Sequence, residues 1–220
     1  MARSRDAGYV SAFEVGVAYT EIKDESYKSH SVSRMRTRDR GYVSKTTIAG
    51  FIDESFEPIA TTTVGSGGSS SITFSSIPAT YKHLQLRFLA RNSGDNISAR
   101  ATFNSDSSSV YTLHELFGDG ASALAAAQTG IAYYPTGLVG PNSSSGVFGV
   151  SVTDILDYAD TNKFKTARTL TGYDINGGAG YVELTSGVWR STSAISSITI
   201  VPNAGNFVQY SHFALYGIKG

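Results

Sequence analysis

The 220-residue chain contains no cysteine, only five prolines and no long apolar run. Without cysteine it can form neither disulfide bonds nor thiolate metal sites. A membrane-spanning helix needs about 18 consecutive apolar residues, and the chain has no such run. No apolar core of the signal-peptide type follows Met1–Asp6. We therefore expect a soluble protein that has no membrane partner and is not exported by such a signal.

Charged side chains are also few, and the two signs balance at 18 basic and 18 acidic residues. Their distribution is uneven. Residues 1–45 carry nine Lys and Arg against six Asp and Glu, an excess of three, whereas residues 46–70 carry three acidic residues and no basic one. Proteins that bind nucleic acids present a much denser basic field. The charge pattern thus predicts no nucleic-acid partner.

What the chain does have is a series of short segments that are apolar on one side and rich in Ser and Thr on the other. Clusters of Asn, Asp, Gly, Ser and Pro separate them, which is typical of sandwiches and jelly rolls. At Ile72 and Ile198 we expect the apolar side chains to point inward and the hydroxyls outward. The expected strands are residues 72–74, 83–91, 97–103, 110–117, 131–134, 147–156, 167–173, 181–184, 195–201 and 207–218.

Two segments depart from this pattern. Thr61–Ser71 is rich in Thr, Gly and Ser and predicts a turn. Ala121–Ala127 is the only stretch that favours a helix, of one or two turns. The sequence as a whole predicts an all-β fold: a jelly-roll-like antiparallel β-sandwich over residues 59–220, preceded by an extended N-terminal arm over residues 1–58.

The arm contains an internal repeat, because Arg5–Ser11 returns as Arg38–Ser44 with six of seven positions identical. Two copies are too few for a solenoid. They are either two equivalent docking elements or a local duplication that forms two paired strands. As docking elements they would use the side chains of Tyr9, Tyr42, Arg5 and Arg38. The arm is too polar to build its own core, so it is either disordered when free or ordered against partners.

The sequence shows no pattern typical of a catalytic or metal site. The four histidines, His30, His83, His114 and His212, lack the spacing of metal ligands. Serine is abundant, but no nucleophile-elbow, kinase or P-loop signature is present. A nucleophilic serine also needs a base and a group that orients the base. We therefore predict no enzyme, no catalytic residue, no bound metal and no cofactor.

Asp154, Asp157 and Asp160 form the densest acidic cluster. On an extended strand Asp154 and Asp157 would project to opposite faces. On a turn the three could converge, and an oxygen-rich Ca²⁺ site would then become possible. Asp157 could also be paired with Glu183 as the two carboxylates of a glycosidase, but nothing in the sequence indicates the separation that this mechanism requires.

Aromatic residues offer a candidate binding surface. Trp189, the single tryptophan, lies beside Arg190 at an expected strand edge, and tyrosines are frequent in the surrounding strands. Such rings with polar neighbours suit sugar stacking or subunit packing. Trp189 and Arg190 are therefore candidates for a glycan or subunit contact. The alternative, which we favour, places Trp189 in the core.

Several stretches of the sandwich resemble a family of tailed-bacteriophage virion proteins. They are Ile59–Gly68 leading to Ile77–Arg87, then Thr161–Arg168, and the ending Ser211–Gly220. The resemblance covers residues 55–220 and implies a β-sandwich that serves as the outer module of phage appendage or surface proteins. It implies no catalytic residues.

From this resemblance we expect a non-enzymatic virion structural protein. Its arm would dock to capsid, adaptor or tail subunits, and the sandwich would face outward in a homo-oligomer such as a trimer. The first hypothesis is a tail-associated or fibre-type module that contacts host cell-surface glycans. The alternatives are a capsid decoration (cement) protein that stabilises the head, and a polysaccharide-degrading enzyme.

Overall fold

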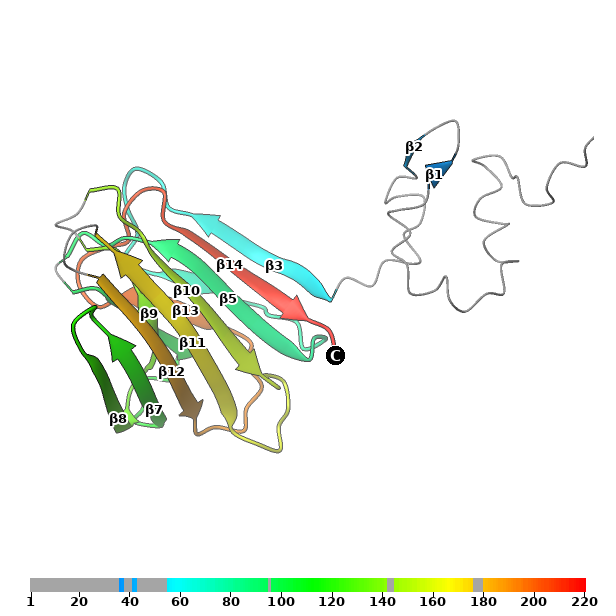
Figure 1. Ribbon diagram of the computed structural model, residues 1–220. Helices are drawn as coiled ribbons and strands as arrows, with labels where there is room; N and C mark the ends of the chain where they lie inside the picture. The colour runs from blue at the N-terminus through cyan, green and yellow to red at the C-terminus, as the bar shows by residue number, and fades with distance from the viewer. Residues whose placement is uncertain (1–35, 38–40, 43–54, 95, 142–144, 176–179) are drawn as a thin grey trace, which may run out of the picture. The chain divides into compact units, whose positions relative to one another are not determined.

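The computed structural model describes residues 36–37, 41–42, 55–94, 96–141, 145–175 and 180–220 (Figure 1). The chain divides into two compact units, Met1–Glu54 and Ser55–Gly220. In the first unit, β1 (Arg36–Thr37) pairs antiparallel with β2 (Gly41–Tyr42). The other docking candidates of the arm, Arg5, Tyr9 and Arg38, lie outside the described residues, as does the side chain of Tyr42.

The second unit is an antiparallel β-sandwich, which confirms the predicted all-β fold class (Figure 1). The larger sheet has the strand order β3 (Phe56–Thr63), β14 (His212–Ile218), β5 (His83–Ala90), β10 (Gly149–Leu156), β11 (Lys165–Asp174), β12 (Gly180–Trp189), β7 (Tyr111–Gly118) and β8 (Ala123–Ile131). The smaller sheet has the order β4 (Ile72–Phe74), β13 (Ile198–Pro202), β6 (Ser98–Phe103) and β9 (Tyr134–Leu138). Within the described residues, no helix is long and apolar enough to cross a membrane.

Most expected strands are confirmed, but two sequence predictions are wrong. Ala121–Ala127 is not helical, because Ala123–Ile131 forms strand β8 against β7. The helix propensity of alanine is a weak preference, and a continuous backbone ladder overrides it. The turn predicted at Thr61–Ser71 is confirmed after β3 ends at Thr63: the amide of Gly68 donates to the carbonyl of Gly65 at 3.1 Å, and Gly68 has a φ of +70°. The expected strand 131–134 is the junction between β8 and β9.

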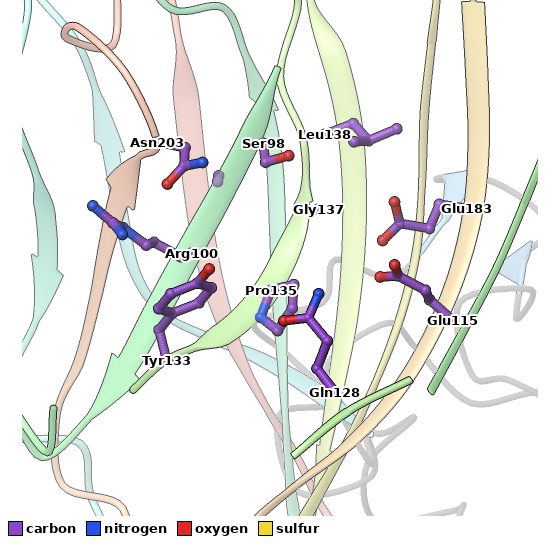
Figure 2. Close-up of a pocket in the computed structure, with 11 residues that line it drawn as sticks. Ser98, Arg100, Glu115, Gln128, Tyr133, Pro135, Gly137, Leu138, Glu183 and Asn203 are labelled. Atoms are coloured by element: carbon purple, nitrogen blue, oxygen red, sulfur yellow. The ribbon is translucent and has the colours of Figure 1, made fainter. Parts of the chain in front are cut away.

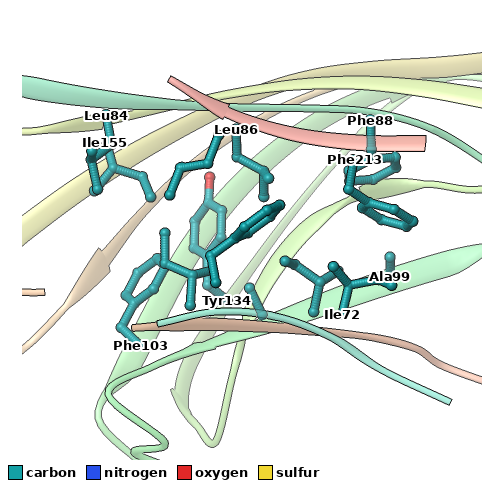
Figure 3. Close-up of a cluster of buried hydrophobic side chains, with 14 of the residues drawn as sticks. Ile72, Leu84, Leu86, Phe88, Ala99, Phe103, Tyr134, Ile155 and Phe213 are labelled. Atoms are coloured by element: carbon teal, nitrogen blue, oxygen red, sulfur yellow. The ribbon is translucent and has the colours of Figure 1, made fainter. Parts of the chain in front are cut away.

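The core lies between the two sheets and is rich in aromatic rings (Figure 3). The ring of Phe213 lies 5.3 Å from that of Phe88 and 4.7 Å from that of Phe207, measured between centroids. On β5, Leu84, Leu86 and Phe88 point inward as predicted. The sandwich therefore has the tightly packed aromatic and aliphatic centre that a domain of this size needs.

In the middle of the larger sheet the alternation is reversed, with hydroxyls inward. Ser151, Thr153, Thr169 and Thr171 on β10 and β11 are all buried, and the register places Ser151 opposite Thr171 and Thr153 opposite Thr169. The hydroxyl oxygens of Thr153 and Thr169 lie 2.7 Å apart, and that of Thr169 lies 3.0 Å from the hydroxyl of Tyr134 on β9. These bonds satisfy groups that would otherwise be buried without partners.

Backbone groups of β9 also bind this hydroxyl cluster. Ser151 Oγ donates to the carbonyl of Thr136 at 2.7 Å, and the amide of Leu138 donates to Thr171 Oγ1 at 2.7 Å. Gly137 lies between them with φ of +131°, and a Cβ atom built there would come within 2.5 Å of Ser151 Oγ. Only glycine allows this close approach of β9 to the larger sheet.

Candidate functional site

The reversed alternation exposes apolar side chains on the outside of the larger sheet. Because the hydroxyls of β10 and β11 point inward, their apolar neighbours point away from the core. Together with outward-pointing apolar side chains of the adjoining strands, they make a set of six on five adjacent strands. Their exposed fractions lie between 44% and 59%. We call them the outer apolar face; they are Leu89, Val150, Leu170, Val182, Leu184 and Leu116.

The strand register groups these side chains in rows. Leu170 on β11 lies directly opposite Leu184 on β12, which in turn lies opposite Leu116 on β7. In the next row, Leu89 on β5 lies opposite Val150 on β10. Side chains directly opposite each other on one face of a sheet are in contact range. Gly172 separates Val150 from Val182 in this second row, so the outer apolar face consists of two neighbouring rows of apolar side chains.

Covering this surface would be favourable. Full burial of one Val or Leu side chain contributes about 1.5–3 kcal/mol, so covering six half-exposed ones contributes on the order of 6 kcal/mol. Contiguous exposed apolar patches are uncommon on soluble monomers and mark interaction surfaces. The outer apolar face thus has the composition of an assembly surface.

A second candidate site is a polar cleft of about 180 Å³ between the inner side of β7 and β12 and the smaller sheet (Figure 2). Glu115 on β7 lies opposite Thr185, and Glu183 on β12 lies opposite Phe117. The two glutamates are thus diagonal neighbours on the same side of the sheet, and both carboxylates line the cleft (Figure 2).

The two carboxylates have different surroundings. Burial raises the pKa of Glu115 above its usual range, and the negative charge of Glu183 adds to this effect. Thr185 Oγ1 donates a hydrogen bond to Glu183 Oε1 at 2.7 Å. On the opposite wall, the guanidinium of Arg100 lies 5.2 Å from the ring centroid of Tyr133. The cleft could hold a hydroxyl-rich ligand or carry out proton transfer between its two carboxyl groups.

No pattern in the sequence indicates this pair of glutamates. The structure separates Glu183 from Asp157, its candidate partner in the sequence. Asp157 follows the end of β10, whose last residue Leu156 lies opposite Thr166, whereas Glu183 lies opposite Thr171 near the other end of β11. Only the pairing of β7 with β12 brings Glu115 to Glu183, and no local pattern signals that pairing.

The acidic cluster does not converge on an ion site. Asp154 lies on the outward side of β10, where its Oδ1 accepts a hydrogen bond from Gln85 at 2.7 Å. Asp157 is bound instead by lysines: the ammonium of Lys82 lies 2.8 Å from its Oδ1, and Lys163 binds its Oδ2. These lysines lower the pKa of Asp157 to about 2. Among the described residues, no group of three His, Asp or Glu could hold a metal ion.

The structure places Trp189 in the core, with 2% of its surface exposed. Its indole Nε1 donates to the carboxylate of Asp106 at 2.8 Å, and its ring stacks against that of Tyr111 at 6.4 Å between centroids. The core alternative is therefore confirmed, and the ring is not accessible to a glycan or a neighbouring subunit in this conformation. Arg190, the next residue, is exposed.

Comparison with known proteins adds nothing to this description: no protein-family model matches the chain, and no curated protein matches it.

Proposed function

We propose that this protein is a non-enzymatic structural subunit of a tailed-bacteriophage virion, tail-associated or fibre-type. Its first unit anchors it to other virion proteins, and its sandwich faces outward to contact host cell-surface glycans. The observation that carries this proposal is the outer apolar face, which gives the sandwich a large surface suited to contact with another protein. The resemblance of residues 55–220 to tailed-phage virion proteins supplies the virion setting.

A particle-incorporation experiment tests the proposal. Phage carrying Leu170→Glu places a charge in the centre of the outer apolar face, and we expect particles that lack the protein. Thr166→Glu is the matched control, because Thr166 is an exposed residue on the outward side of the same strand. Its particles should contain the wild-type copy number. Incorporation of the Leu170→Glu protein at wild-type level would contradict an assembly role for this face.

Copy number separates the tail from the head. A tail component is present in a few to tens of copies per particle, whereas a capsid decoration protein is present in hundreds. Quantitative mass spectrometry of purified particles therefore decides between the proposed tail-associated role and the alternative of a decoration protein. Absence of the chain from purified particles would exclude both roles.

The cleft with Glu115 and Glu183 favours one further candidate, a polysaccharide-degrading enzyme. Two carboxyl groups in different surroundings are what glycoside hydrolysis requires. Release of reducing ends from host polysaccharide by the purified protein, lost in Glu183→Gln and Glu115→Gln, would establish this activity. The proposed structural role predicts no release by any of the three proteins.

A further inference from the structure

The free edge of the larger sheet is strand β8. In the strand order it is the last strand, and β7 is its one neighbour within the described part of the chain. Eight of its nine residues are exposed, and Ile131 is half-buried. The backbone amides and carbonyls that point away from β7 therefore face solvent along the whole strand, which is a template for pairing with another strand.

Natural edge strands are usually protected against such pairing by charged side chains, prolines or short length. The opposite edge of the same sheet, β3, contains Glu57 and Pro58. Strand β8 has none of these features: its nine residues include no charged side chain and no proline. This difference between the two edges indicates that β8 is the edge that accepts another strand.

From these features we propose that β8 pairs antiparallel with β8 of a second copy of this chain across a two-fold axis, joining the two larger sheets. A strand without charges can meet its own copy without repulsion. The side chains of Ala123 and Ala125–Ala127 are small, whichever side of the sheet they point to. They therefore do not hinder the approach of a partner strand. An isologous contact of this kind needs only one surface patch, used by both subunits.

The outer apolar face reaches the same edge of the sheet. Ala125 on β8 lies opposite Leu116 on β7, so the outer apolar face continues to the free edge. A two-fold axis perpendicular to the sheet keeps the outer faces of both copies on the same side. Pairing of the two edges would then join the two outer apolar faces into one surface of twice the width. The inference deepens the proposed assembly role, on which it rests, by naming the partner at this edge.

The first test is the mass of the purified full-length chain by light scattering and sedimentation over a range of concentrations. We expect a dimer of twice 23.3 kDa for the wild type. Ala125→Lys/Ala127→Lys on β8 should give the monomer, because lysines protect an edge. Thr61→Lys/Thr63→Lys on the exposed part of β3 is the matched control and should remain dimeric. Circular dichroism and thermal melting establish that each variant is folded.

The absence of cysteine from the chain allows a second test that does not depend on loss of binding. Residue 127 is the midpoint of Ala123–Ile131, so symmetric pairing of the strand places it opposite itself. Neighbouring Cα atoms in antiparallel strands are about 4.5–5.5 Å apart, which is within the range of a disulfide. We expect Ala127→Cys to form covalent dimers on oxidation, and Thr62→Cys on β3 to form none.

Three outcomes would overturn the inference: a wild-type chain that stays monomeric, an oligomer that persists in the β8 lysine variant, and a cysteine scan over residues 123–131 without covalent dimers. A trimer abolished equally by the β3 and β8 lysine variants would also overturn it, since it would indicate edge-to-edge contacts between β3 and β8. These measurements use purified protein without particles. Failure of the dimer is therefore distinguishable from failure of the proposed virion role.

Discussion

At the scale of single residues, Lys165 is the most unusual side chain of the sandwich. It is fully buried, and its Nζ donates hydrogen bonds to the backbone carbonyls of Asp160, Lys163 and Thr192, the last two at 2.9 and 3.1 Å. Burial lowers the pKa of this ammonium. The side chain thereby holds the loop after β10 against the segment after β12.

We expect Lys165→Met to lower the free energy of unfolding by about 2–3 kcal/mol, because it removes hydrogen bonds from a charged donor to buried carbonyls. Urea denaturation measures the change. Arg168→Met on the same strand is the control, since Arg168 is exposed and its closest approach to Asp154 is 3.8 Å. Its effect should stay below about 1 kcal/mol. An equal loss in both variants would contradict the role given to Lys165.

A second residue-scale prediction concerns the pH dependence of stability. Lys163 and Lys82 lower the pKa of Asp157 to about 2, below its ordinary value of 3.8. A carboxyl whose pKa is depressed on folding contributes stability above its unfolded pKa, and this contribution is lost as the pH falls through the folded pKa. We therefore expect the wild type to lose part of its stability between about pH 5 and pH 2.

Asp157→Asn should remove this part of the pH dependence. The difference in free energy of unfolding between wild type and variant should be largest at neutral pH and should shrink as the pH falls toward 2. Thermal melting at a series of pH values measures it. A difference that does not change with pH would show that Asp157 acts through packing or backbone geometry, such as its positive φ of 48°, and not through its charge.

At the scale of elements, the buried hydroxyls of β10 and β11 decide which side of the sheet faces the core. Thr169→Val keeps the size and shape of the side chain but removes the hydroxyl that binds both Tyr134 and Thr153. Because the two partners are buried, we expect a loss of about 1–3 kcal/mol in the free energy of unfolding. Chemical denaturation measures this loss. Thr166→Val, on the exposed side of the same strand, should be neutral.

The strands also show where sequence patterns are sufficient and where they fail. The alternation of Leu84, Leu86 and Phe88 with polar residues correctly predicted both strand β5 and its buried side. On β10 and β11 both sides are compatible with burial, because threonine and valine have similar shapes. The side is chosen by the bonds to β9, which are contacts between segments far apart in the chain. The prediction of a helix at Ala121–Ala127 failed for a different reason, because hairpin pairing with the preceding strand β7 overrides the weak helix propensity of alanine.

At the scale of the whole molecule, the division into Met1–Glu54 and Ser55–Gly220 predicts that the sandwich folds without the first unit. We expect a protein lacking residues 1–50 to keep its melting temperature and far-ultraviolet spectrum but to be absent from phage particles. Melting curves and quantitative mass spectrometry of particles measure the two properties. Incorporation of the truncated protein would exclude the docking role of the segment that contains Tyr9 and Tyr42.

The sequence by itself determined the class of the fold and the position of most strands, because alternation and turn residues act within a few neighbours along the chain. It also indicated that Trp189 belongs in the core. Only the tertiary structure decided which side of β10 and β11 faces outward, and that Glu115 and Glu183 share a cleft. Both depend on the pairing and layering of strands far apart in sequence, and local propensity carries no information about such contacts.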